Sequence, residues 1–290
     1  MPHPLSLWDG GWGALAGTDN SDTHHQRRQF MPIYAIGDIH GQKAMLDYAL
    51  ALIAADGGAD AHIVFIGDYT DRGPDSRAVI EALIAGKNAG RNWTFLMGNH
   101  DRMFCDYVTS AKEHDPKVKS NISWINPRLG GANTLASYGV TGTPHFDHPL
   151  NGFETLTRYT RDGDNIPPAQ IARETRAAVP QAHVDFLRSR PLTLATEDLI
   201  FVHAGLRPDV ALEDQDVEDL IWIREGFLET DHDFGRIVVH GHTALEHPTH
   251  FGNRVDIDGG AGYGRPLIPL VFEGRDCWTL TGTGRVPLLP

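Results

Sequence analysis

Short apolar runs that each end in a cluster of polar residues constrain the fold of this chain more than any other feature. The five clearest runs are residues 33–36, 62–66, 93–97, 199–202 and 237–239. A further run at 254–258 ends at a glycine pair. Runs of aliphatic and β-branched residues bounded by glycine are typical of strands buried on both faces. We therefore expect buried strands, each followed by a polar loop.

The segments between the first three runs predict helices. Residues 42–55 and 76–85 carry apolar side chains at helical spacing. Alternation of strand, helix and strand implies parallel pairing with crossover helices. Residues that follow parallel strands gather at the carboxyl edge of the sheet, where α/β proteins bind ligands. The polar clusters are therefore expected to converge on one site at that edge.

The middle of the chain, residues 104–197, has no clear strand alternation and contains Pro-rich and Gly-rich pieces. Residues 169–178 and 181–189 within it are predicted to be helical. We expect a mainly helical insertion that covers the polar edge. Its side chains that could line a groove are Trp124, Arg128, Asn133 and Tyr138. Packing within the insertion is the favoured alternative, because aromatic residues are core residues first.

Length and charge limit the function classes. The 290 residues suit one α/β domain over 31–290, and residues 1–30 are expected to be a poorly ordered leader rather than a secretion signal. The net charge of −13 disfavours nucleic acid and anionic membranes as partners. No apolar stretch approaches membrane-spanning length, so the cytoplasm is the expected location.

The two cysteines, Cys105 and Cys277, exclude some chemistry. They are too few for a disulfide framework or a cysteine zinc site. Neither has an arginine six residues later, so the chemistry of cysteine phosphatases is excluded. Both are interpreted as buried apolar residues.

The polar clusters supply a set of metal-donor side chains. These are Asp38, His40, Asp68, Asn99, His203 and His242. Oxygen and imidazole donors without thiolate suit Mn²⁺, Fe or Zn²⁺. Six donors are too many for one catalytic ion with an open position, so we predict two ions that share one carboxylate. Asp68 follows the central run and is the natural bridge. Each of these residues alone could be a turn residue or a helix cap. The occurrence of all the clusters together, each after a predicted strand, favours a metal site.

The clusters resemble the signatures of a known family. Residues 37–41, 67–73 and 98–101, followed by 203–205 and 241–243, are similar in order and spacing to the motifs of the phosphoprotein phosphatase family of calcineurin-like metallophosphoesterases. Residues 220–225 are similar to the segment that supplies a phosphate-binding arginine in its bacterial and phage members. The resemblance covers about residues 32–275 and is weak in the insertion. It implies an α/β fold with a central two-sheet β-sandwich flanked by helices.

The resemblance also implies the role of each residue. One ion would bind Asp38, His40 and Asp68, and the other Asp68, Asn99, His203 and His242. Mn²⁺ is the expected metal, with Fe or Zn²⁺ as alternatives, and a metal-bridging hydroxide would attack phosphorus directly.

The groups around the phosphate follow from the same resemblance. Arg72 and Arg224, together with Asn99, would bind the phosphoryl oxygens. His100 would protonate the leaving oxygen, and Asp71 would orient that imidazole.

The function implied is that of a metal-dependent phosphoprotein phosphatase of the serine/threonine type, with tyrosine also open. Its substrate would be a phosphoprotein or a small phosphoester. A symmetrical dinucleoside tetraphosphate hydrolase is the alternative, because Asp101 stands where protein phosphatases usually have Glu. Asp71 counts against this alternative, since the tetraphosphatases tend to lack that carboxylate. A non-catalytic metal-binding scaffold is disfavoured, because no donor is missing.

Overall fold

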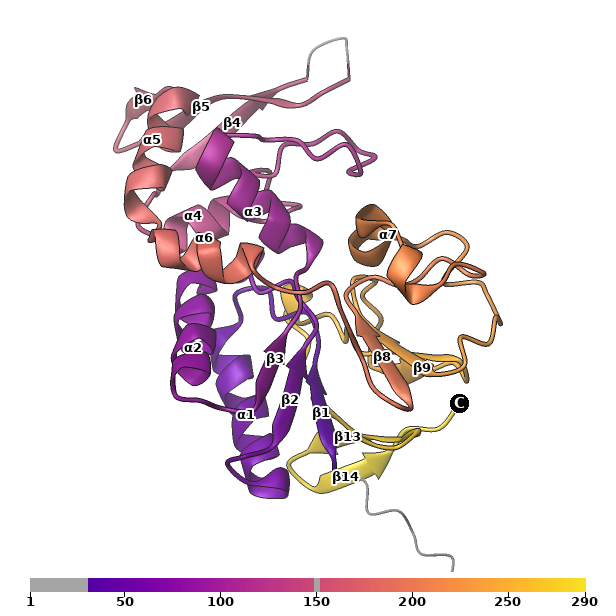
Figure 1. The fold of residues 1–290 in the computed structure, drawn as a ribbon. Coiled ribbons are helices and arrows are strands. Elements are labelled where there is room, and N and C mark those ends of the chain that lie inside the picture. The colour runs from indigo at the N-terminus through magenta and orange to yellow at the C-terminus, as the bar shows by residue number, and fades with distance from the viewer. Residues whose placement is uncertain (1–30, 149–151) are drawn as a thin grey trace, which may run out of the picture. The chain divides into compact units, whose positions relative to one another are not determined.

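The computed structural model describes residues 31–148 and 152–290 (Figure 1). The expected leader, residues 1–30, lies outside the described residues. The described elements form two large sheets, a third small sheet and the helices that cover them. No helix within the described ranges combines the length and the apolar character needed to cross a bilayer.

The first large sheet has six strands in the order β14-β13-β12-β1-β2-β3. Its parallel half consists of β1 (Ile33–Ile36), β2 (His62–Phe65) and β3 (Trp93–Phe95). Its antiparallel half consists of β12 (Leu270–Glu273), β13 (Asp276–Thr281) and β14 (Gly284–Pro287). The crossover helices α1 (Lys43–Gly57) and α2 (Ser76–Asn88) connect the parallel strands. The predicted alternation of strands and helices is confirmed.

The second large sheet has five strands in the order β10-β11-β9-β8-β7. They are β7 (Thr193–Ala195), β8 (Leu199–Val202), β9 (Ile237–His240), β10 (Thr249–His250) and β11 (Arg254–Asp256). Strands β8, β9 and β11 are parallel, and the two edge strands are antiparallel. The short helix α7 (Val217–Trp222) packs through Leu220 and Ile221 on the outer face of this sheet.

The two large sheets pack face to face. Ala35 and Val64 of the first sheet share one apolar core with Phe201 and Val239 of the second. Neighbouring residues on the same strands point to the opposite faces, because side chains alternate along a strand. The structure therefore confirms the two-sheet α/β sandwich flanked by helices.

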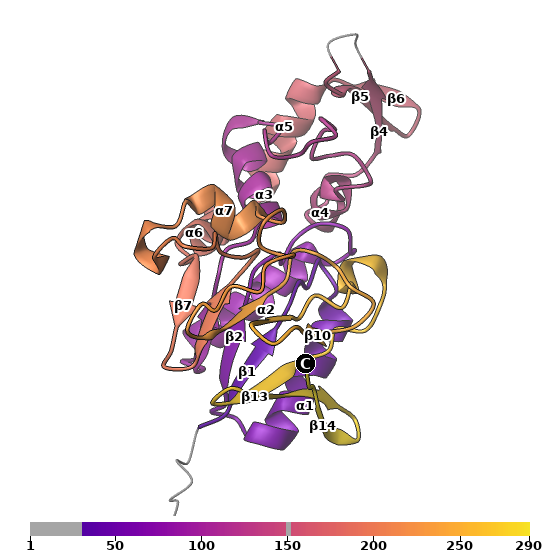
Figure 2. The ribbon, with the colours of Figure 1, turned by 90° about the vertical axis from the view of Figure 1, so that its right-hand side faces the viewer.

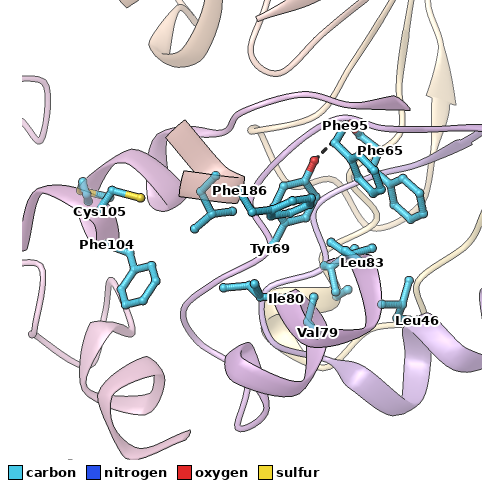
Figure 3. Close-up of a cluster of buried hydrophobic side chains, with 14 of the residues drawn as sticks. Leu46, Phe65, Tyr69, Val79, Ile80, Leu83, Phe95, Phe104, Cys105 and Phe186 are labelled. Carbon is cyan, nitrogen blue, oxygen red and sulfur yellow. Dashed lines mark hydrogen bonds between the residues drawn. The ribbon is translucent and has the colours of Figure 1, made fainter. Parts of the chain in front are cut away.

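A second core lies between the first sheet and its helices and continues into the insertion (Figure 3). Phe65 and Phe95 stack at a ring separation of 5.1 Å, and Phe186 of the insertion meets Phe95 edge-on at 5.2 Å. The buried Tyr69 donates its hydroxyl proton to the carbonyl of Leu96 at 2.6 Å. The insertion is thus joined to the sheet by packing, not only by its chain connections.

The insertion follows the start of α3 (Asn99–Ser110) and extends from the carboxyl ends of β1, β2 and β3 (Figures 1 and 2). Its further helices are α4 (Gly131–Ser137), α5 (Pro168–Ala178) and α6 (Gln181–Arg188). The last two confirm the helices predicted for 169–178 and 181–189.

The insertion also contains an antiparallel sheet that the sequence pattern did not predict. Its strands are β4 (Thr143–Asp147), β5 (Thr155–Arg161) and β6 (Asp164–Ile166). The expectation of a mainly helical insertion did not include this sheet. The physical reason is exposure, because only Leu156 and Tyr159 of β5 are buried and no apolar alternation marks the strands.

Candidate active site

The polar loops converge as expected at the carboxyl ends of the strands. Asp38 and His40 follow β1, Asp68 follows β2, and Asn99 begins α3 directly after β3. His203 follows β8 and His242 follows β9. All six predicted donors are buried. The edges of both large sheets therefore contribute to one cluster.

Asp68 lies between two groups of donors. One of its carboxylate oxygens, Oδ2, is 3.6 Å from Nε2 of His40, which is itself 3.9 Å from Oδ2 of Asp38. Its other oxygen, Oδ1, is 3.5 Å from Nε2 of His203. Donor atoms of Asp68, His203 and His242 all lie within 4.8 Å of one another. Asp68 is therefore the carboxylate that lies near both groups of donors.

Hydrogen bonds fix the orientation of the imidazoles. Nδ1 of His40 is 2.7 Å from the carbonyl of Thr70, and Nδ1 of His203 is 3.0 Å from the carbonyl of Ile66. A carbonyl requires a proton on Nδ1, so the Nε2 lone pair of each ring points into the cluster. Nε2 of His242 is buried and has no hydrogen-bond partner among the described residues.

The donor set fits divalent cations. Nε2 of His203 is 2.9 Å from Oδ1 of Asn99, so two lone-pair atoms face each other, an arrangement that a cation between them satisfies. Burial lowers the pKa of the His203 and His242 rings, which keeps them neutral and able to coordinate. Burial and the nearby Asp258 and Asp68 carboxylates raise the pKa of Asp38. A bound cation would offset that repulsion.

His100 and Asp71 form a buried pair. Nδ1 of His100 is 2.7 Å from Oδ2 of Asp71, and the opposite ring nitrogen, Nε2, is 3.2 Å from Nη2 of Arg72. Burial raises the pKa of the Asp71 carboxyl and lowers the pKa of the His100 imidazole. The short contact requires a proton between Nδ1 of His100 and Oδ2 of Asp71. The predicted general acid and its orienting carboxylate are therefore in contact.

The two predicted phosphate-binding arginines flank the cluster. Arg72 contacts Nε2 of His40, and its guanidinium lies over the ring of Tyr263 at 4.8 Å. Arg224 donates from Nη2 to the carbonyl oxygen of His242 at 3.2 Å. Both guanidinium groups therefore border the donor atoms.

The loops of the site are held in unusual backbone conformations. Five predicted site residues have positive φ, namely His40, Asp68, Asp71, Arg72 and His242. Such conformations are sparsely populated for residues with a Cβ, and they persist where surrounding contacts enforce them. Asp101 supplies part of that enforcement, because its carboxylate accepts the backbone N–H groups of Asp68 and Tyr69 at 2.9 Å each. This structural role of Asp101 was not foreseen.

A cleft of about 640 Å³ opens beside the donors. The site residues that line it are Asp68, Arg72, Asn99, His100, Arg224 and His242. Four further cations line it as well, namely Lys117, Lys119, Arg128 and Arg207. Arg207 pairs with Asp219 at 2.6 Å and Lys119 with Glu225 at 2.5 Å. The side chains of Lys117 and Arg128 have no hydrogen bond or ion pair with any residue that the structure describes.

Some contacts of the site were not visible in the sequence. Trp124, expected in the groove or the core of the insertion, is buried and donates its indole N–H to Asp71. Thr134 contacts the same carboxylate. Tyr138 is buried in the core, in agreement with the alternative that the aromatic residues pack within the insertion. Arg128 lines the cleft. No local motif marks Trp124 or Thr134, because their contacts with Asp71 span more than fifty residues.

Neutral imidazoles and carboxylates around one shared aspartate, bordered by arginines, define a metal-dependent phosphoesterase. Residues 31–263 match the calcineurin-like phosphoesterase family. The chain belongs to that family, whose members use a dinuclear metal centre.

Two named relatives are dinucleoside tetraphosphatases. The asymmetrical bis(5'-nucleosyl)-tetraphosphatase PrpE of Geobacillus thermodenitrificans is 24% identical over 90% of this chain and 97% of its own. The symmetrical bis(5'-nucleosyl)-tetraphosphatase of Janthinobacterium sp. is 28% identical over 61% of this chain. That match spans 45% of the relative, so the chain covers less than half of its length.

Solved structures with the same fold include enzymes of different specificity. A candidate diadenosine tetraphosphatase superposes with a TM-score of 0.55 at 18% identity, over 90% of this chain and 96% of the other. A cold-active protein-tyrosine phosphatase of Shewanella superposes with a TM-score of 0.54 at 16% identity, over 90% and 81% of the two chains. These likenesses support the fold alone.

Proposed function

We propose that this metallophosphoesterase hydrolyses dinucleoside tetraphosphates. The observation that carries the proposal is the basic cleft, in which Lys117 and Arg128 are unpaired within the described residues and lie along the same cavity as the donors. A single phosphate monoester is already matched by Arg72, Arg224 and the metals. A tetraphosphate bridge carries about four negative charges, and additional cations in the cleft bind the phosphates that do not react. The PrpE relative, which aligns over nearly its whole length, supports the same substrate class.

In this proposal the donors hold two cations. Asp38, His40 and Asp68 hold one, and Asp68, Asn99, His203 and His242 hold the other, with Mn²⁺ as the expected metal. When bound, the cations lower the pKa of a water molecule and polarise the phosphoryl group. Residues 31–290 act as the catalytic domain, and residues 104–197 cover its cleft.

The protein's own side chains carry out the remaining steps. Arg72 and Arg224 orient the phosphoryl oxygens and stabilise the charge that develops on them. Asp71 holds the Nδ1 proton of His100, and His100 donates to the leaving oxygen a second proton, which Nε2 takes up from water before this step.

The test is incubation with diadenosine tetraphosphate and Mn²⁺, followed by ion-exchange chromatography of the nucleotides. Water addition at the central anhydride yields two ADP, and addition at a terminal position yields ATP and AMP.

Replacing Lys117 and Arg128 together by alanine should raise KM for diadenosine tetraphosphate about tenfold and leave KM for p-nitrophenyl phosphate unchanged. The matched control is Arg207→Ala, since Arg207 is already paired with Asp219. Intact dinucleotide after incubation, or equal KM changes for both substrates, would contradict the proposal.

A phosphoprotein phosphatase is the second candidate, and the His100–Asp71 pair favours it. Serine and threonine alkoxides are poor leaving groups that need protonation, and a proton taken up from water on Nε2 of His100 would meet that need. A higher kcat/KM for a phosphopeptide than for diadenosine tetraphosphate would establish this candidate. Failure to hydrolyse any of these esters with Mn²⁺, Fe²⁺ or Zn²⁺ would instead support a non-catalytic scaffold.

A further inference from the structure

We propose that Trp124 and Thr134, both in the insertion, are positioning residues that hold the Asp71 carboxylate against His100. The inference rests on the proposed phosphoester hydrolysis. It gives the insertion a part in the chemistry beyond covering the cleft.

Both carboxylate oxygens of Asp71 are held from the insertion. The indole N–H of Trp124 donates to Oδ2 at 2.7 Å, and that same oxygen lies 2.7 Å from Nδ1 of His100. The hydroxyl of Thr134 donates to the other oxygen, Oδ1, at 2.7 Å. It also accepts the backbone N–H of Asp71 at 2.8 Å. With a donor on each oxygen the carboxylate cannot rotate, and Oδ2 stays aimed at the imidazole.

Packing fixes the direction of the indole N–H. The Trp124 ring lies 5.0 Å from the ring of Tyr107 and 6.0 Å from that of Phe104, both on α3. A Cβ on Gly131, the first residue of α4, would lie 2.6 Å from Cδ2 of Trp124, so α4 packs directly against the indole. Because α4 also carries Thr134, one segment of the insertion sets both donors.

The contacts have a chemical consequence for the leaving-group step. The Trp124 and Thr134 donors fix the Asp71 carboxylate so that Oδ2 accepts the Nδ1 proton of His100. Nε2 of His100 then faces the cleft, which His100 lines. Without either donor the Asp71 carboxylate can rotate, and the imidazole of His100 is no longer held in a fixed orientation.

The experiment compares two monoesters that differ in leaving group. Trp124→Phe and Thr134→Val should lower kcat for an alkyl phosphate about tenfold or more, and change kcat for p-nitrophenyl phosphate by less than about threefold. Thr134→Ser keeps the hydroxyl and should restore the wild-type ratio. Trp93→Phe is the matched control, because this half-buried tryptophan of β3 packs on Phe65 and Phe95 and does not contact Asp71.

A second readout is independent of turnover. The Nδ1 proton of His100, hydrogen-bonded to a buried carboxylate, should give a downfield proton NMR resonance in the wild type and in Trp93→Phe. In Trp124→Phe that resonance should shift or broaden. If Trp124→Phe fails to fold, the Thr134→Val and Thr134→Ser pair carries the test.

The outcomes separate this inference from the proposed function. Equal losses on both monoesters, or an unchanged ratio and resonance in Trp124→Phe and Thr134→Val, would overturn the positioning role while hydrolysis itself stands. A wild-type protein that cleaves neither the monoesters nor diadenosine tetraphosphate would overturn the proposed function, and the NMR comparison would still report on the contacts of Asp71.

Discussion

Asp68 is the residue with contacts to both halves of the donor cluster. Its Oδ1 accepts the backbone N–H of His100 at 2.9 Å and lies near His203, while its Oδ2 faces His40. A single carboxylate in this position contributes charge to two ions at once. Its neutral isostere keeps the shape but removes that charge.

Asp68→Asn should therefore lower kcat by roughly 10³-fold and weaken Mn²⁺ binding. Activity assays together with isothermal titration of Mn²⁺ measure both effects. Asp60→Asn, at an exposed carboxylate outside the site, is the control. Retention of wild-type Mn²⁺ affinity in Asp68→Asn would contradict the bridging role.

His100 is expected to act only on the leaving group. His100→Asn should lower kcat for an alkyl phosphate by about 10²–10⁴-fold, and much less for p-nitrophenyl phosphate, whose leaving group departs without protonation. Steady-state kinetics on the two substrates measure the difference. Equal losses on both would refute the general-acid assignment.

At the scale of elements, the site is built where strands end in tight loops. Gly98 caps α3 at the end of the loop after β3, and its φ of −96° lies in an ordinary region. Gly98 is required for steric reasons, because a Cβ at this position would clash with Oδ1 and the backbone nitrogen of Asp68. The close approach of two strand-to-loop junctions leaves no room for a methyl group.

Gly98→Ala should push the Asp68 carboxylate out of place and lower Mn²⁺ affinity by at least about tenfold. Titration calorimetry measures the affinity, and thermal unfolding checks that the domain is intact. Gly259→Ala is the matched control, since a Cβ there lies 3.4 Å from Cδ of Pro248, an ordinary contact. Normal Mn²⁺ affinity in Gly98→Ala would show that the junction has room after all.

At the scale of the whole domain, the last strand is tied to the first crossover helix far from the site. Arg285 of β14 donates from Nε to Asp56 of α1 at 2.9 Å and from Nη1 to Glu273 at 2.5 Å. Tyr34 of β1 donates its hydroxyl proton to Asp56 at 2.7 Å. The hydrogen bond from Arg285 lowers the pKa of Asp56. The contacts link residues from both ends of the described domain.

Asp56→Ala should lower the free energy of unfolding by about 1 kcal/mol at pH 7. Because the folded-state pKa of Asp56 is lowered, its stabilisation is present above the unfolded pKa and is lost as pH falls through the folded pKa. The difference between wild type and variant should therefore be smaller at an acidic pH, below the ordinary aspartate pKa of about 4, than at pH 7. Urea unfolding at both pH values tests this, with Asp47→Ala, which breaks an exposed pair with Lys43, as the control. The same loss at both pH values would show that charge is not the cause.

The fold class and the convergence of the six candidate donors could be predicted because their signals are local. A buried strand is recognised as a short apolar run, and the candidate donors lie within a few residues after it. The order of residues alone therefore implies that these donors meet at one edge of the sheet. The strands of the insertion were missed because β4, β5 and β6 are largely exposed and show no apolar alternation. Exposure removes the pattern on which such predictions depend.

The sequence by itself determined the buried strands, the crossover helices and the convergence of the candidate donors, because each of these follows from local patterns at or just after strand ends. The family resemblance of the same motifs implied the two-sheet frame and the pairing of His100 with Asp71. Only the tertiary structure decided that Trp124 and Thr134 hold Asp71, that Asp101 supports the loop of Asp68, and that Lys117 and Arg128 line the cleft. These contacts join segments that are far apart along the chain. Packing of the whole domain brings these partners together, so no single segment of the sequence predicts them.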